Sequence, residues 1–224
     1  MRALYPISYA VRLPVVGKYL GQLALLLAAL TAVPLAVALF LGEGGLALRL
    51  ALVTAVLLAS GIPAIRLPAP AFIQENEAFA VVGLAYLLAP VFMAWPLTVP
   101  GIPLLDAFFE ATSGITTTGL STLASVEDKP PGFIFARAWL QWYGGLGIAV
   151  LSVALMMGHH VAARRLFQPE AEEATLVTTT RTHARRVLLV YAILTLLAFL
   201  ILWPALGEAF PALLHTLAAV STGG

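Results

Sequence analysis

Two short runs rich in threonine and glycine are the residues of this chain best suited to chemistry. Their members are Thr116, Thr117, Thr118 and Gly119 in the first run, and Ser221, Thr222, Gly223 and Gly224 in the second. Backbone carbonyls in such runs can replace the hydration shell of a cation, because glycine tolerates the backbone angles that turn a carbonyl toward a pore. Threonine hydroxyls can add a further ligand. The runs therefore predict an ion-binding filter, and the alternative is that they are ordinary turns or loops.

The chain offers little for covalent catalysis. The sequence contains no evident nucleophile–base pair, no paired carboxylates inside an apolar run, no phosphate-binding loop and no cysteine. No pairing of serine with histidine favours an intramembrane hydrolase. We therefore expect a protein that is not an enzyme and that holds no organic cofactor.

Composition places most of the chain in a membrane. Of its 224 residues, 61% are hydrophobic and only 10% are charged, and the mean hydropathy is +0.96. Soluble globular domains do not have this composition. The net charge is +1 and the basic residues are spread along the chain, so no basic domain exists to hold a nucleic acid.

Hydrophobic runs predict an all-α membrane protein with five full spans and two shorter half-helices. The spans are predicted at about 20–41, 46–65, 78–97, 135–158 and 187–204, and the half-helices at about 103–114 and 208–220. A secretory signal is the alternative for 20–41, but that run is too long for the apolar part of a signal, and further spans follow it.

Each half-helix leads directly into one of the threonine–glycine runs. A helix of about a dozen residues covers roughly half of the hydrocarbon thickness of a bilayer. The run after it would then lie at membrane depth, where non-helical backbone is tolerated only if protein buries it or if it lines a watery cavity. A half-helix, a filter and a full helix in this order are the parts of a cation pore loop.

The basic residues predict the orientation. With the N-terminus inside, nine lysines and arginines fall in inner segments and three in outer segments, which is a positive-inside bias. Ser125 is then outside and Thr178 inside. Both half-helices enter from the outer side with their C-terminal ends toward the membrane middle, where the helix dipole favours a cation.

A shift of 105 residues superposes the first half-helix and filter on the second. We define a pore unit as an outer helix, a pore half-helix, a filter and an inner helix. The predicted divisions are a two-span region (1–75), a first pore unit (76–165), a cytoplasmic loop (166–186) and a second pore unit that stops at its filter (187–224). The chain is therefore expected to be a fragment that carries about half of a pore.

Three segments of the chain match a known family. They are FFEATSGITTTGLS (108–121), LQWYGGLGIAVLSVAL (140–155) and LLHTLAAVSTGG (213–224). These segments resemble the Trk/Ktr/HKT superfamily of potassium transporters, and most closely its bacterial TrkH type. The two spans before the first pore unit resemble the extra helix pair of TrkH-type members.

The resemblance implies four pore units around one pore and potassium uptake across the bacterial cytoplasmic (inner) membrane. K+ would be the transported ion, bound by the eight residues of the two filter runs. The implied partners are the lipid bilayer, a cytoplasmic nucleotide-binding regulatory subunit and, in the full-length protein, a second copy in a homodimer. The charged segment 164–186 is either a solvated linker or a contact surface for that regulatory subunit. The residues alone are compatible with potassium or sodium.

Five residues near the filter runs are predicted to support them, namely Glu110, Gln141, Gly144, Gly145 and Gly147. Glu110 could hydrogen-bond backbone N–H groups of the filter loop or could concentrate cations. Gln141 could hydrogen-bond the backbone of the filter or of the pore helix. The glycines could make room for the filter backbone, or they could serve ordinary helix packing.

Two charged neighbours of these residues have their own predicted roles. Asp106 is expected to cap the start of the first half-helix. Arg137 either reaches the membrane surface as an interfacial arginine or pairs with Glu110 or Asp106.

Two other classes of membrane protein remain as alternatives. A secondary transporter with its site on broken helices would need an inverted repeat, whereas the two half-helices here are predicted to enter from the same side. A non-conducting assembly protein would not need two filter runs after half-helices.

Overall fold

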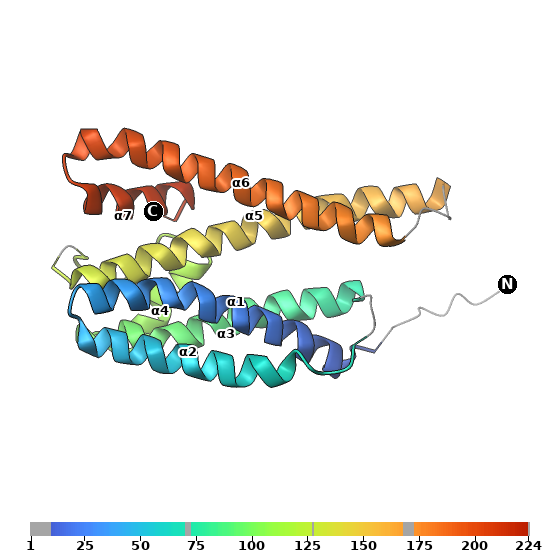
Figure 1. Cartoon of the computed structure of the whole chain (residues 1–224), viewed down its shortest axis with the longest axis horizontal. Helices are drawn as coiled ribbons and strands as arrows, with labels where there is room; N and C mark the ends of the chain where they lie inside the picture. The colour runs from blue at the N-terminus through green and yellow to red at the C-terminus, as the bar shows by residue number, and fades with distance from the viewer. Residues whose placement is uncertain (1–9, 70–72, 127, 168–172, 224) are drawn as a thin grey trace. The chain divides into compact units, whose positions relative to one another are not determined.

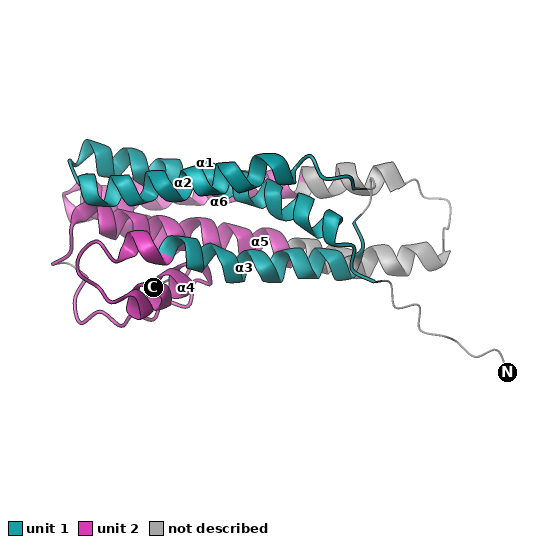
Figure 2. Cartoon of the chain, turned by 90° about the horizontal axis from the view of Figure 1, so that it is seen from below, with its two compact units in different colours: residues 1–93 teal, residues 94–224 magenta. Residues whose placement is uncertain are grey.

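The computed structural model describes residues 10–69, 73–126, 128–167 and 173–223, with the side chains of 75, 153–181 and 183 left out. The described residues are helical and form two compact units, Met1–Met93 and Ala94–Gly224 (Figure 2). This all-helical architecture is the predicted fold class.

Unit 1 consists of α1 (Leu13–Phe40), α2 (Gly44–Ala64) and most of α3 (Glu75–Leu97). Helices α1 and α2 lie side by side as an antiparallel hairpin (Figure 1). They approach closely because Gly21 faces Ala64 and Gly61 faces Leu25, and a Cβ on either glycine would lie within 3 Å of its neighbour. Small residues at a helix crossing allow this approach between membrane helices.

A buried ion pair joins the starts of α1 and α3 within unit 1. The Glu77 carboxylate is fully buried and accepts hydrogen bonds from Arg12 Nε at 2.7 Å and Arg12 Nη2 at 2.8 Å. The backbone N–H groups of Arg12 and Gln74 donate to the same carboxylate at 3.1 and 3.0 Å. This contact was not predicted from the sequence.

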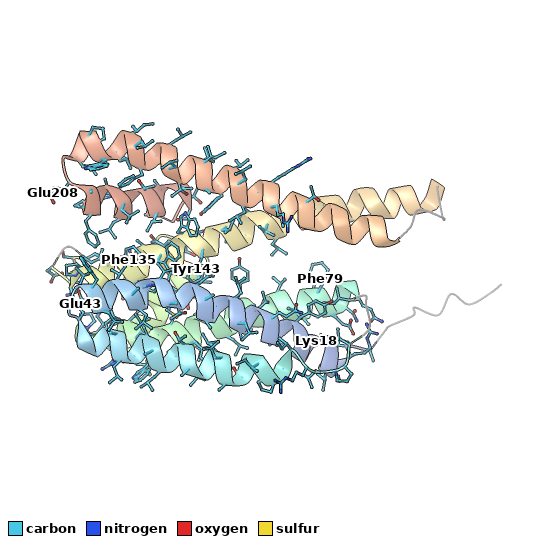
Figure 3. The ribbon with its side chains drawn as sticks, in the orientation of Figure 1. Lys18, Glu43, Phe79, Phe135, Tyr143 and Glu208 are labelled. Carbon is cyan, nitrogen blue, oxygen red and sulfur yellow. The ribbon has the colours of Figure 1, made fainter. Side chains whose placement is uncertain are left out.

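Unit 2 contains α4 (Leu104–Ile115), α5 (Pro131–Phe167), α6 (Glu173–Leu206) and α7 (Ala209–Val220). Helix α5 packs against α4, α6 and α7, and α7 folds back alongside α6 (Figure 1). Glu208 lies at the turn between α6 and α7, and Phe135 and Tyr143 lie along α5 (Figure 3). Phe133 and Leu140 of α5 are fully buried.

Four described helices are long and apolar enough to cross a membrane, at 13–40, 44–64, 76–97 and 184–206. They correspond to four of the five predicted spans, although the first begins seven residues before its predicted start at 20. The fifth predicted span, 135–158, lies within α5, and its second part extends beyond the described side chains. Each of α4 and α7 has 12 residues, or roughly 18 Å of helix, which is too short to span.

The segment predicted as a cytoplasmic loop, 166–186, is mostly helical. Helix α5 continues to Phe167 and α6 begins at Glu173, so the described residues of this range belong to helices and not to a loop. Residues 168–172 lie outside the described part of the chain. Charged side chains made the segment polar enough to suggest a linker, but glutamate, alanine and arginine are also strong helix formers.

Candidate functional site

The C-terminal ends of α4 and α7 share one backbone conformation. Thr116 and Ser221 end the two helices with right-handed angles (φ −85°, ψ 0° and φ −79°, ψ −6°). The next residues, Thr117 and Thr222, are left-handed, with φ of 54° and 58°. The members of each pair are 105 residues apart, as the predicted repeat requires.

Equivalent hydrogen bonds close both helix ends. Thr118 N donates to Ser113 O at 2.9 Å, and Gly223 N donates to Ala218 O at 3.0 Å. Thr117 N donates to Gly114 O, and Thr222 N donates to Ala219 O, both at 3.1 Å. These bonds form a Schellman motif, which satisfies the last helix carbonyls when one residue adopts left-handed angles.

Threonine is an unusual residue for that left-handed position. Glycine normally occupies it, and a β-branched residue there is strained by about 1–3 kcal/mol. The described residues contain two non-glycine residues with positive φ, and both are these threonines. Strain of this kind persists where the surrounding structure holds it, and it is often found where a backbone has a function.

Carbonyl groups of the first filter run are open to a ligand. Among the described residues, no donor is bonded to the carbonyls of Thr117, Thr118 or Gly119, and the last two residues are exposed. Gly119 has a φ of 76°, which only glycine adopts easily. The Thr116 and Thr118 hydroxyls are 2.7 Å apart and share a hydrogen bond.

Glu110 holds the loop that follows the first filter run. Its side chain is fully buried, and Oε1 accepts from Ser121 Oγ at 2.7 Å and from Thr122 N at 2.8 Å. The predicted hydrogen bond from Glu110 to a loop N–H group is therefore present. The sequence analysis did not name Ser121 or Thr122.

Arg137 of α5 pairs with the same carboxylate. Its Nε donates to Glu110 Oε2 at 2.6 Å. Of the two roles predicted for Arg137, the structure therefore shows the ion pair, and the partner is Glu110. Burial raises the pKa of the Glu110 carboxyl, but the hydrogen bonds from Ser121, Arg137 and Thr122 lower it more, and the net pKa lies below its ordinary value. Both oxygens of the Glu110 carboxyl are thus occupied by loop and arginine donors.

Asp106 does not cap α4 as predicted. The cap residue is Pro103, and no side chain bonds to the first N–H groups. Asp106 instead lies in the first turn, where a carboxylate interacts favourably with the helix dipole. The prediction was wrong because Pro103 defines the helix start three residues earlier.

Helix α5 makes a side-chain contact with the second run. Gln141 is buried, and its Nε2 donates to the carbonyl oxygen of Gly223 at 2.9 Å. Gln141 therefore contacts the second run, 82 residues away in the sequence. The Ser113 hydroxyl of α4 donates to the carbonyl oxygen of Leu120, the residue after the first run, at 2.6 Å.

Two of the three predicted supporting glycines of α5 lie against the ends of the half-helices. A Cβ on Gly144 would collide with the backbone of Ile115, whose C and Cα atoms would be 2.8 Å away. A Cβ on Gly145 would lie 2.9 Å from Ser221 Cβ and 2.8 Å from Tyr191 Oη. Gly147 is exposed and does not share this burial. Gly224, the last predicted filter residue, lies outside the described residues.

A second set of contacts, not predicted from the sequence, joins α5 to α6. Tyr191 Oη donates to the carbonyl oxygen of Trp142 at 2.9 Å, and Trp142 Nε1 donates to Thr195 Oγ1 at 3.0 Å. Thr195 Oγ1 in turn donates to Tyr191 O at 2.7 Å. The sequence signal was weak, since a tyrosine and a threonine four residues apart are common on apolar helices.

The described residues contain no cluster of histidine, aspartate and glutamate side chains that could hold a metal ion. The oxygen atoms offered by the two half-helix ends are therefore backbone carbonyls and hydroxyls.

Comparison with known proteins connects this geometry to one family. The family model for TrkH, described as a cation transport protein, matches residues 74–224. The Trk system potassium uptake protein TrkH of Escherichia coli K12 is 34% identical over 159 residues, which cover 68% of this chain and 33% of that protein. The Trk system potassium uptake protein TrkI of Halomonas elongata is 31% identical over 214 residues, which cover 92% of this chain and 43% of that protein.

An archaeal protein is also similar. An uncharacterized cation transporter of Methanocaldococcus jannaschii is 29% identical over 157 residues, which cover 69% of this chain and 33% of that protein. The chain thus spans between a third and a half of the length of these curated relatives.

Proposed function

The chain belongs to the TrkH family of cation transport proteins, and from this premise we propose that it forms part of a potassium-conducting pore in a cell membrane. In this proposal the ends of α4 and α7 each supply one filter segment. The relatives' names support potassium as the ion, because two of them are potassium uptake proteins.

The single observation that carries the proposal is the shared conformation of the two half-helix ends. Two 12-residue helices, 105 residues apart, end in the same Schellman motif with a left-handed threonine. In the first of them the carbonyls of Thr117, Thr118 and Gly119 have no donor among the described residues. A filter needs such carbonyls, held in place by the surrounding protein and free to bind an ion.

Potassium would move through this filter down its electrochemical gradient. A negative interior contributes about 2.3 kcal/mol per charge for each 100 mV of membrane potential. The open carbonyls would replace water around the ion, and the C-terminal ends of α4 and α7 would add the favourable negative end of each helix dipole.

The proposed setting is the bacterial cytoplasmic membrane, with the N-terminus in the cytoplasm. The positive-inside bias of the sequence supports this orientation. A cytoplasmic nucleotide-binding regulatory subunit and a second copy of the full-length protein are the proposed partners. The relatives' designation as parts of a Trk system supports a multi-component transporter.

The filter assignment is tested by Gly119→Ser in a transporter of full family length that carries residues 1–224. A side chain at φ 76° would strain the backbone or crowd the pore. We expect a reduced preference for potassium over sodium, measured as reversal potentials or competitive cation uptake. Leu120→Ile, which alters the exposed next residue, is the matched control. Wild-type preference and rate in Gly119→Ser would contradict the assignment.

The orientation is tested by single-cysteine labelling, for which the absence of native cysteine gives a clean background. An impermeant thiol reagent applied to intact cells should label a cysteine introduced at Ser125 and not one at Thr178. The reverse labelling pattern would show that the N-terminus lies outside.

A further inference from the structure

The second filter segment lies against a surface of α5 that α6 also contacts. The position of a Cβ on Gly145 would be 2.9 Å from Ser221 Cβ, 3.0 Å from Ser221 Cα and 2.8 Å from Tyr191 Oη. Ser221 is the residue at which α7 ends and the filter begins. The Tyr191 hydroxyl and Ser221 therefore both lie beside Gly145, next to the position that a Cβ would occupy.

Three hydrogen bonds fix Tyr191 at that point. Its hydroxyl donates to the Trp142 carbonyl, the Trp142 indole donates to the Thr195 hydroxyl, and that hydroxyl donates to the Tyr191 carbonyl. We call Tyr191, Trp142 and Thr195 the α5–α6 clasp. Each of the three side-chain donors in the clasp has an acceptor.

Aromatic packing limits the movement of the clasp. The rings of Trp142 and Tyr191 are 5.4 Å apart at a tilt of 56°, and Trp139 stacks on Trp142 at 4.8 Å. Tyr191 is 8% exposed, although most residues of α6 around it are exposed apolar side chains. Among the described residues, the clasp is therefore a polar link that holds this part of α6 against α5.

We propose that Tyr191 is a positioning residue for the second filter segment. Tyr191 acts through Gly145, because it sets how closely α5 lies against Ser221. The proposal rests on the proposed function. With the hydroxyl bonded to Trp142, α5 cannot turn or withdraw at Gly145 without breaking the clasp. The Ser221 backbone is thereby held in contact with α5, and Gln141, one turn earlier, keeps its hydrogen bond to Gly223.

The first test is Tyr191→Phe in the full-length transporter, which removes one hydroxyl and keeps the ring. We expect the preference for potassium over sodium to fall by about two- to tenfold, the range that one hydrogen bond contributes. Thr195→Val removes the acceptor of Trp142 and should produce a change in the same direction. Tyr19→Phe, the same substitution in α1 of unit 1, is the matched control, and the amount of folded protein in the membrane is measured for every variant.

The second test asks whether Tyr191 acts through Gly145. Gly145→Ala introduces a methyl group that must displace either Tyr191 or Ser221, and the clasp holds Tyr191 in place. We expect Gly145→Ala to lower ion preference, and Tyr191→Phe added to it to restore part of that loss, because removal of the hydroxyl leaves space for the methyl group. A role in helix packing alone predicts that the double variant regains folded protein in the membrane without regaining ion preference.

Two results would overturn the inference. One is wild-type ion preference in Tyr191→Phe with normal amounts of protein, and the other is a double variant no better than Gly145→Ala. Gly119→Ser is measured beside them. If it lowers ion preference while Tyr191→Phe does not, the positioning role fails and the filter assignment stands. If Gly119→Ser also leaves the preference unchanged, the proposed function itself fails.

Discussion

The ends of α4 and α7 have the same backbone and different supports. The first is held by a buried carboxylate, since Glu110 binds Ser121 and Thr122 of the following loop and Arg137 of α5. The second has an exposed histidine, His215, at the position of Glu110. It is held instead by Gln141 and by contact with Gly145.

This difference shows which features of a helix end depend on its own residues and which depend on side chains packed against it. The Schellman motif and the left-handed threonine depend on six residues of each helix end, so they occur in both. The supports depend on the side chains of each half-helix and on those that α5 presents to it, so they differ. Each support can therefore be removed and compared with a matched change elsewhere in the chain.

The largest expected effect comes from the carboxylate. Glu110→Ala leaves Arg137 without its partner and removes the bonds to Ser121 and Thr122, and breaking a buried ion pair costs about 3–5 kcal/mol. His215→Ala alters the equivalent exposed position and should change stability by less than about 0.5 kcal/mol. Thermal unfolding of the purified protein in detergent measures both. Equal losses in the two variants would contradict the difference between the ends.

The next effect concerns the close contact with the end of α4. Gly144→Ala places a methyl group against the Ile115 backbone, which cannot move as a side chain can, so overpacking should cost about 1–3 kcal/mol. Gly83→Ala in α3, where a Cβ meets no atom within 4 Å, is the control and should be neutral or slightly stabilising. The same unfolding measurement applies, and a harmless Gly144→Ala would show that the contact is loose.

An effect of similar size is expected at the second end. Gln141→Leu keeps the bulk of the side chain but leaves the Gly223 carbonyl without its donor, at a cost of about 1–3 kcal/mol for a buried acceptor. Gln22→Leu, at an exposed position of α1, provides the control. We expect Gln141→Leu to change ion preference as well as stability. An effect on neither would remove Gln141 from the supports of the second filter.

The smallest effect tests what the two ends share. Thr117→Gly and Thr222→Gly remove the strain of a β-branched residue at positive φ but add backbone entropy to the unfolded chain, so each should stabilise by at most about 1 kcal/mol. Thr118→Gly, which relieves no such strain and loses the hydroxyl pair with Thr116, should destabilise. Opposite signs at positions 117 and 222 would show that the two ends are not equivalent.

The helices were predictable because they follow from hydrophobic runs and breakers. The half-helices predicted at 103–114 and 208–220 are Leu104–Ile115 and Ala209–Val220. The left-handed threonines were not predicted, since residue preference points to glycine, whereas the helix end requires left-handed angles at whichever residue occupies that position. The sequence predicted that Gln141 hydrogen-bonds the backbone of the filter or of the pore helix, and its bond to Gly223 agrees with the first of these. It did not indicate that the partner belongs to the second run, nor that Arg12 contacts Glu77, because neither periodicity nor spacing indicates which distant residues meet.

The Arg12–Glu77 pair has a consequence for the order in which the protein is made. The partners are 65 residues apart, so at about 5–20 residues per second the carboxylate leaves the ribosome roughly 3–13 s after its arginine. Because α1 and α2 run in opposite directions, the start of α3 returns to the end of the hairpin at which Arg12 lies. The α1–α2 hairpin is therefore made before the carboxylate that its N-terminal arginine binds, and the pair forms only when α3 follows.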